Sequence, residues 1–301
     1  IDSMHEIRQH VQNKYIYFIV DETTDVCGRY IANLLVGSLC EDSFHKPSLV
    51  AVKELDKTNN VTISRFIQEA LANLYLPDSI PFDKVLLMIS DAATYMVKAS
   101  TNLKIFYPNL IHCSCLAHGV NRVAEEIRNK FPLINDLINV KKVFIKAPLR
   151  VQMYKEKLPD TPLPPKPIVT RWGTWLEAAL FYFKYFKEIK ETVFLYDDDV
   201  SSAIRESKQI LNNPNVSQQL SYIKSNYSLV SDTILKLEKR GMSLHESISL
   251  VENLKITLET SKDNIGKAVY KKINEVLEKM KGLKYSQKYI EHSLVIFVTM
   301  F

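Results

Sequence analysis

The sequence predicts an α/β fold followed by an all-α region, and three observations support this. Short apolar runs with β-branched residues alternate with segments of helical spacing over the first 115 residues. A proline-rich stretch near residue 160 then interrupts the chain. Only helical periodicities follow it. We therefore expect an α/β core over residues 1–158, a basic connector over 159–172 and an all-α domain over 173–301.

The sheet is expected to contain five strands of two kinds. The candidates are Tyr15–Val20, Tyr30–Cys40, Ser48–Glu54, Lys84–Ile89 and Asn109–His112. Polar, proline-containing stretches separate the first three, which suits a meander. The fourth, "KVLLMI", is almost entirely apolar, as is typical of a parallel strand buried on both faces of a sheet. A mixed sheet with helices packed on it follows from this order.

Helical spacing appears between the later strands and throughout the second half. The expected helices of the α/β part are Val61–Leu74, Ala92–Ala99 and Leu116–Lys130. Those of the second half are Trp175–Glu191, Ser217–Lys239, Ser243–Thr260 and Lys262–Lys281. Their apolar stripes face polar surfaces on the opposite side, as in helices that bury one face.

The composition is that of a globular protein, with 46% hydrophobic and 24% charged residues. Seven glycines and the absence of GxxxxGK[ST] or GxGxxG exclude the common phosphate-binding loops. Four cysteines indicate reduced thiols in an intracellular protein. No signal peptide is apparent, and the apolar tail Ser293–Phe301 is too short to span a membrane. Because the first residue is Ile, we expect a piece of a longer protein.

Two acids follow the apolar strands at corresponding places. Asp21, in "YFIVDETTDV", closes the first strand, and Asp91 closes the fourth. If these strands are parallel neighbours, both carboxylates emerge at one edge of the sheet, where open sheets bind ligands. Paired carboxylates there suit Mg²⁺ or Mn²⁺ and phosphodiester cleavage. The alternative is that these acids only satisfy turns, which is the expected role of Asp25.

The segment "HCSCLAH", residues 112–118, concentrates thiols and imidazoles. Cys115 and His118 lie three residues apart at a helix start and can face one point. Together with His112 and Cys113 they resemble a zinc site in composition, although the spacing is cramped. A structural cluster of buried thiols and hydrogen-bonded imidazoles is the preferred interpretation.

Positive charge is concentrated between residues 141 and 172. Eight Lys or Arg and two acids give this window a net charge of +6. Its basic side chains are Lys141, Lys142, Lys146, Arg150, Lys155, Lys157, Lys166 and Arg171. Such a block suits a phosphate-bearing partner or a solvated helix surface. "TRWGTW" follows, in which Arg171 could hold phosphate and Trp172 could stack on an unpaired base, while Trp175 is expected in the core.

Taken in order, four motifs resemble the hAT superfamily of DNA transposases, especially the transposase-like hAT proteins of animal genomes. They are "IVDETTDV", "LLMISDAATYMVKAS", "HCSCLAHGVNRV" and "TRWGTW". The resemblance covers roughly residues 10–180. It implies a ribonuclease H-like core interrupted by an all-α insertion that begins near Trp172. It also implies cleavage of DNA at transposon ends and joining of the freed 3′ ends to a target.

The resemblance assigns roles to several residues. Asp21 and Asp91 become the first two members of an Asp–Asp–Glu metal triad, Cys115 and His118 lie beside it, and Trp172 handles distorted DNA ends. The catalytic Glu should follow the insertion. The three available acids, Glu275, Glu278 and Glu291, lie on amphipathic helix surface, and we assign this role to none of them. The family's N-terminal zinc finger is also missing from this segment.

The leading hypothesis is therefore a transposase-derived nucleic-acid-binding domain with a partial Mg²⁺ or Mn²⁺ site, inactive as the isolated segment. The expected partner is DNA, with self-association through regions outside the segment, no membrane, no small-molecule cofactor, and a nuclear location. One alternative is a domesticated, non-catalytic protein-interaction scaffold. Another is a small-molecule α/β enzyme that uses Asp91.

Overall fold

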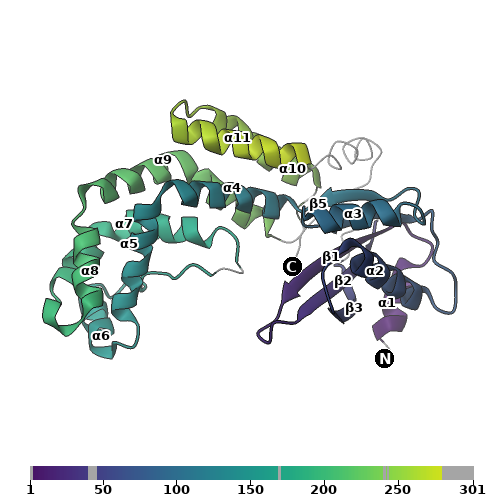
Figure 1. Cartoon of the computed structure of the whole chain (residues 1–301), viewed down its shortest axis with the longest axis horizontal. Coiled ribbons are helices and arrows are strands. Elements are labelled where there is room, and N and C mark those ends of the chain that lie inside the picture. Colours follow the sequence, from purple (N-terminus) through teal and green to yellow (C-terminus); the bar gives the residue numbers. More distant parts are fainter. Residues whose placement is uncertain (1–2, 40–45, 169–170, 240–241, 243, 280–301) are drawn as a thin grey trace. The chain divides into compact units, whose positions relative to one another are not determined.

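The computed structural model describes residues 3–39, 46–168, 171–239, 242 and 244–279 (Figure 1). Contacts divide the chain into two compact units. Of the described residues, those within 1–119, 237–249 and 275–279 form the α/β unit, and those within 120–236 and 250–274 form the helical unit. Residues 120–158, which we expected in the α/β part, are thus grouped with the helical unit.

The α/β unit contains a mixed five-stranded sheet, as the sequence predicts. In chain order its elements are α1 (Ser3–Val11), β1 (Ile16–Thr24), β2 (Tyr30–Ser38), β3 (Ser48–Leu55), α2 (Asn60–Tyr75), β4 (Val85–Ser90), α3 (Thr94–Leu103) and β5 (Ile111–Ser114). The strand order is β3-β2-β1-β4-β5. The β1–β2 and β2–β3 pairs are antiparallel, while β1–β4 and β4–β5 are parallel. Every residue of β4 is buried, in agreement with its uniformly apolar sequence.

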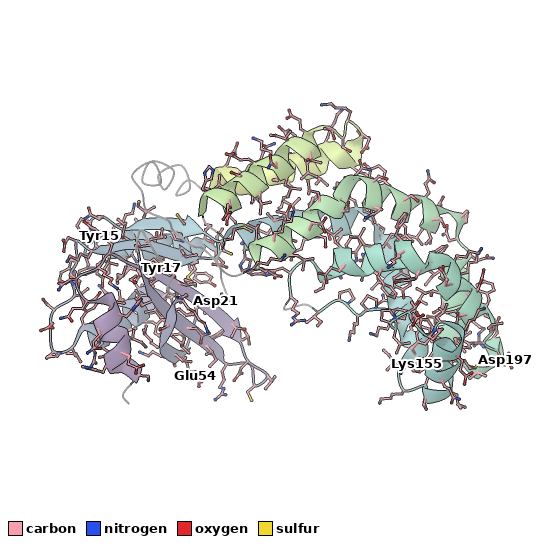
Figure 2. All side chains as sticks on the ribbon, turned by 180° about the vertical axis from the view of Figure 1, so that it is seen from behind. Tyr15, Tyr17, Asp21, Glu54, Lys155 and Asp197 are labelled. Carbon is pink, nitrogen blue, oxygen red and sulfur yellow. The ribbon has the colours of Figure 1, made fainter. Side chains whose placement is uncertain are left out.

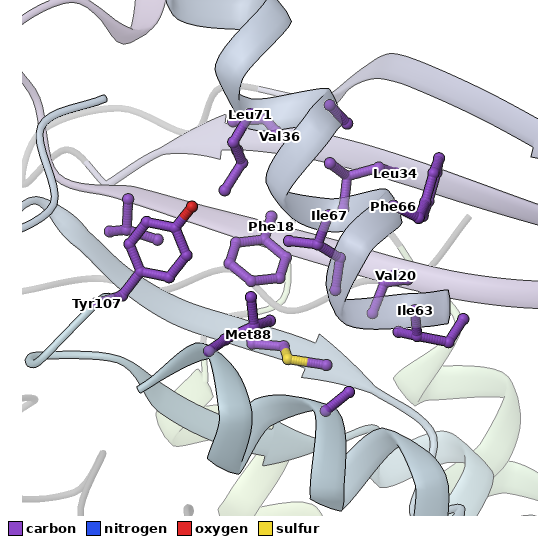
Figure 3. Packing of buried hydrophobic residues seen from close by; sticks show 14 of the residues in the cluster. Phe18, Val20, Leu34, Val36, Ile63, Phe66, Ile67, Leu71, Met88 and Tyr107 are labelled. Atoms are coloured by element: carbon purple, nitrogen blue, oxygen red, sulfur yellow. The ribbon is translucent and has the colours of Figure 1, made fainter. Parts of the chain in front are cut away.

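Helix α2 packs on one face of this sheet (Figure 3). Residues Ile63, Phe66, Ile67, Ala70, Leu71 and Leu74 form its buried stripe. The stripe covers the side chains of alternate β1 residues, such as Phe18 and Val20. A capping box begins the helix: Asn59 Oδ1 accepts from the amide of Thr62 at 3.0 Å, and Thr62 Oγ1 accepts from the amide of Asn59 at 3.2 Å. Such a cap typically stabilises a helix by about 1 kcal/mol.

The first strand is longer than the sequence indicated. β1 continues past Val20 to Thr24, because its antiparallel pairing with β2 extends to the pair Thr24↔Tyr30. Its parallel pairing with β4 stops earlier, at Ile19↔Ile89. The expectation that Asp21 closes the strand is therefore wrong. Asp21 lies inside β1, just beyond the part that pairs with β4.

The remaining elements are helices. They are α4 (Leu116–Lys130), α5 (Pro132–Ile138), η1 (Asn139–Phe144), α6 (Pro148–Lys157), α7 (Thr174–Phe194), η2 (Asp198–Val200), α8 (Ser202–Leu211), α9 (Pro214–Leu237), α10 (Leu244–Glu259) and α11 (Asn264–Lys279). The described residues beyond β5 contain no strand, which confirms the all-α character of the second half. Within the described part of the chain, every helix is too short or too polar to cross a membrane.

Candidate functional site

The candidate site lies in the α/β unit, at the carboxyl ends of β1 and β4. These strands are parallel neighbours, as the sequence argument required. Asp91 directly follows β4, and Asp21 comes two residues after the last β1–β4 pair, Ile19↔Ile89. Figure 2 labels Asp21 on its strand. Because side chains alternate along a strand, Asp21 points to the face opposite that of Val20 and Glu22.

Asp21 is a carboxyl group in an unfavourable place for its charge. Burial raises its pKa from 3.8 to about 6. The amide of Glu22 donates to Asp21 and opposes the shift, while the negative charges of Asp91 and Glu22 increase it. A bound cation would stabilise the ionised form of Asp21, which partial burial and the neighbouring negative charges disfavour.

The neighbouring acid, Glu22, has its own partner on the other face of β1. Tyr95, in the first turn of α3, donates a hydrogen bond to Glu22 Oε2 at 2.7 Å. Burial raises the pKa of Tyr95, and the hydrogen bond to Glu22 adds to the shift, so this hydroxyl keeps its proton. Glu22 is thereby held by α3, away from Asp21. Sequence reasoning did not identify Tyr95, because nothing in the pattern of α3 distinguishes it from a core tyrosine.

A second network fixes the end of β4. Ser90 Oγ lies 2.9 Å from the carbonyl oxygen of Asp91 and 2.8 Å from His112 Nε2. Since a carbonyl only accepts, the single hydroxyl proton of Ser90 goes to Asp91, and His112 Nε2–H donates to Ser90. Burial lowers the pKa of His112 to about 4, which keeps the imidazole neutral. His112 therefore links β5 to β4 and positions the backbone of Asp91.

The thiols and imidazoles of residues 112–118 lie near this strand end. Cys113 and Cys115 are buried, and the amide of Cys115 donates to the carbonyl of Ser90 at 2.8 Å. Burial raises the pKa of the Cys115 thiol to about 11, so the thiol keeps its proton in the absence of a metal. His118 is half-buried in the first turn of α4. These features favour a structural role for the cluster.

The donor set at the strand ends fits a hard divalent cation. Asp21 and Asp91 supply carboxylate oxygens, the ligands that Mg²⁺ and Mn²⁺ prefer, and Mg²⁺ commonly takes one or two carboxylates and keeps several waters. Within the described ranges, no three or more His, Cys, Asp or Glu side chains are grouped so as to hold a metal ion. The pair is thus a partial ligand set. Glu275 and Glu278 lie on α11, and Glu291 lies outside the described residues.

Asp25 has a local structural role. Its Oδ1 accepts from the amides of Cys27 and Arg29, each at 2.9 Å, and its Oδ2 accepts from Arg29 Nε at 2.7 Å. These bonds close the turn between β1 and β2 and lower the pKa of Asp25. Asp25 therefore serves the turn, as expected from the sequence.

The basic residues of the helical unit do not all offer a free charge. Lys142, in η1, forms an ion pair with Glu206. Arg150, in α6, donates from Nε to the carbonyl of Val143 at 2.6 Å. Lys146 is exposed and follows η1 with a positive φ of 52°. In this block, the side chains of Lys141 and Lys146 form no hydrogen bond or ion pair among the described residues.

The two tryptophans of the "TRWGTW" segment differ in burial. Trp175 is 7% exposed, and its Nε1 donates to Asn135 Oδ1 at 2.6 Å, which confirms its expected core position. Trp172 is half-buried and Arg171 is exposed. Arg171 and Trp175 line a cavity of about 240 Å³ beside the start of α7. Lys146 borders a different, open groove along α6.

Comparison with known proteins gives a family match over part of the chain. Residues 1–144 match the family model described as "Domain of unknown function (DUF659)", a domain associated with hAT-family transposase-like proteins. The matched range includes Asp21, Asp91, Cys115 and His118 and ends before Arg171. None of the curated proteins searched matches the chain.

Proposed function

We propose that this chain is a transposase-derived, nucleic-acid-binding domain in which Asp21 and Asp91 form part of a divalent-metal site for DNA strand cleavage and transfer. One observation carries the proposal. Asp91 follows β4 and Asp21 lies in β1 just beyond the last β1–β4 pair, close enough for the charge of Asp91 to raise the pKa of Asp21. The DUF659 match over residues 1–144 supports it, because that domain is associated with transposase-like proteins.

The chemistry supplied by Mg²⁺ or Mn²⁺ at such a site is activation of a water or 3′-hydroxyl and stabilisation of the leaving oxygen. The residues of this chain contribute positioning. Asp21 and Asp91 hold the cation, and the Ser90–His112 hydrogen bond fixes the backbone from which Asp91 projects. The proposed triad also needs a third carboxylate, and we assign that role to no described residue, so metal binding is the property of this chain that we test.

The proposed partner is DNA, and the proposed location is the nucleus. Cations of the helical unit would contact phosphates, chiefly the exposed Arg171 and Lys146 and the half-buried Lys141, because Lys142 and Arg150 already have protein partners. Trp172 would stack on an unpaired base. Self-association would use regions outside this segment.

Calorimetric titration with MnCl₂ tests the metal site. We expect one binding event in the native protein at pH 7 and a loss of affinity of about tenfold or more in Asp91→Asn and in Asp21→Asn. The matched control is Glu54→Gln, which removes one exposed acid of the same unit. If Asp91→Asn binds Mn²⁺ as tightly as this control, the metal proposal fails.

The second candidate function is a domesticated, non-catalytic scaffold, which the partial ligand set favours. DNA binding across salt concentrations separates the two. Phosphate contacts predict that affinity falls steeply as salt rises. If fluorescence anisotropy detects no binding to single- or double-stranded DNA at about 50 mM salt, the nucleic-acid proposal is wrong and the scaffold remains.

A further inference from the structure

The cavity beside the start of α7 offers hydrogen-bond donors and positive charge from three parts of the helical unit. Arg128 comes from the end of α4, Lys166 from the proline-rich connector and Arg171 from the residues before α7. Against these three cations the lining contains one acid, Glu125. Among the described residues, no carboxylate forms an ion pair with any of the three. The cavity therefore carries an excess of unneutralised positive charge.

The amide of Asn135 is oriented by two donors. Its Oδ1 accepts from Trp175 Nε1 at 2.6 Å and from Arg128 Nε at 3.3 Å. Both bonds require the oxygen at this position, so the assignment of the amide is fixed and Nδ2 is left as a donor at the cavity wall. The bond to Arg128 also positions its guanidinium, whose remaining N–H groups are free to meet a ligand.

Two further polar groups of the cavity wall, on Asn121 and Gly173, bond to each other. Asn121 Oδ1 accepts from the amide of Gly173 at 3.1 Å, so both groups are already paired. Available groups are thus mainly donors: Asn135 Nδ2 and the side chains of Arg128, Lys166 and Arg171. A set of donors around a cavity of about 240 Å³ favours an anion, and this volume accommodates a phosphate group with part of its ester.

We propose that this cavity binds the phosphate group of a phosphate ester, with the remainder of the ligand outside it. The ester is either a free nucleotide or the end of a nucleic-acid strand. The second source rests on the proposed function and deepens it, whereas the first does not depend on it. Arg128 and Asn135 are new to the binding surface, since sequence reasoning placed the cations between residues 141 and 172 only.

The hydrogen bond from Trp175 to Asn135 provides a direct reporter. The chain has two tryptophans, so an NMR spectrum of the ¹⁵N-labelled full chain contains two indole N–H signals, and Trp172→Phe assigns them. The titrants are dAMP and 2′-deoxyadenosine. We expect dAMP to shift the Trp175 signal saturably and 2′-deoxyadenosine, which lacks the phosphate, to leave it unchanged.

Charge-removing variants test the residues. Arg128→Gln and Lys166→Gln should each raise the Kd for dAMP by about threefold or more, as expected for loss of a charge-assisted contact. Lys155→Gln is the matched control: it removes one exposed positive charge on α6, outside the cavity (Figure 2). The Trp175 signal of the free Lys166→Gln and Lys155→Gln variants should match that of the native protein, whereas Arg128→Gln loses its own bond to Asn135, so urea denaturation checks its fold.

Two hexanucleotides, identical except for a 5′-phosphate or a 5′-hydroxyl, identify the source of the phosphate. A Trp175 shift that requires the 5′-phosphate supports the cavity and assigns it to strand ends. A shift with dAMP but with neither strand supports the cavity for a free nucleotide, while the nucleic-acid part of the proposed function loses its support here. The absence of a saturable shift with any phosphate, an equal shift with 2′-deoxyadenosine, or an equal weakening by Lys155→Gln would overturn the proposal.

Discussion

The hydroxyl of Tyr95 donates a 2.7 Å hydrogen bond to Glu22 Oε2, which joins the first turn of α3 to β1. Glu22 and Asp21 are consecutive, but they point to opposite faces of the sheet. Tyr95 therefore holds one acid on the α3 side, and the other is the acid whose pKa the charge of Asp91 raises. The two consecutive acids have separate roles, one in packing and one in the candidate metal site.

The Tyr95–Glu22 bond should stabilise the α/β unit. Tyr95→Phe removes the hydroxyl and should lower the free energy of unfolding by about 1 kcal/mol, a value at the low end for a charged acceptor because both side chains are partly exposed. Urea denaturation measures the loss. In the double variant with Glu22→Gln, the two losses should not add. Full additivity would show that the bond contributes nothing to stability.

Stability should depend on pH through Asp21. The folded state raises its pKa from 3.8 to about 6, so between these values the native protein binds more protons than the unfolded chain. Its contribution is therefore present below about pH 4 and is lost as pH rises through about 6, by about 3 kcal/mol in all.

The comparison that isolates this contribution is between the native protein and Asp21→Asn, with metal removed by chelator. The variant should be more stable relative to the native protein at pH 7 than at pH 4, because asparagine has no charge to desolvate. Other groups, such as Asp25, have lowered pKa values and act in the opposite direction, but they cancel in the difference. A difference that stays constant from pH 4 to pH 7 would contradict the assigned pKa.

The general fold could be predicted from the sequence because its signals are local. The apolar β4 run and the helical stripe of α2 are each visible in a few residues. The end of β1 could not be predicted, because the acids and threonines after Val20 are typical of a turn. Pairing with β2 keeps them in the strand, and that pairing depends on residues about ten positions away.

Only part of the candidate site could be predicted, because several of its contacts join residues far apart in the sequence. The sequence placed Asp21 and Asp91 together only on the condition that their strands are parallel neighbours, and the β1–β4 pairing meets that condition. The contacts of Tyr95 with Glu22 and of Arg128 with Asn135 join side chains whose meeting depends on how the helices pack. No sequence motif marks such contacts, so these residues became visible only in the structure.

Gly37 should be intolerant of any side chain. A Cβ at this position would lie 2.4–2.6 Å from the ring atoms of Tyr17, its partner on β1, and Tyr17 is 3% exposed and has no room to move. Gly37→Ala should therefore lower the free energy of unfolding by about 2 kcal/mol through overpacking. In a Tyr17→Leu background, which removes the ring, the same substitution should cost much less. An unchanged cost would mean that the backbone, not the ring, requires glycine.

The cysteines should differ sharply in reactivity. Cys27 is exposed in the β1–β2 turn, while Cys115 is buried with its pKa raised to about 11, so only about a thousandth of this thiol is ionised at pH 8. In a Cys40→Ser background, iodoacetamide followed by mass spectrometry should label Cys27 first and leave Cys113 and Cys115 unmodified until the protein unfolds. Labelling in 6 M guanidinium provides the reference rates. If native Cys115 reacts as fast as Cys27, it carries the thiolate that a zinc ligand needs, and the structural role assigned to residues 112–118 is wrong.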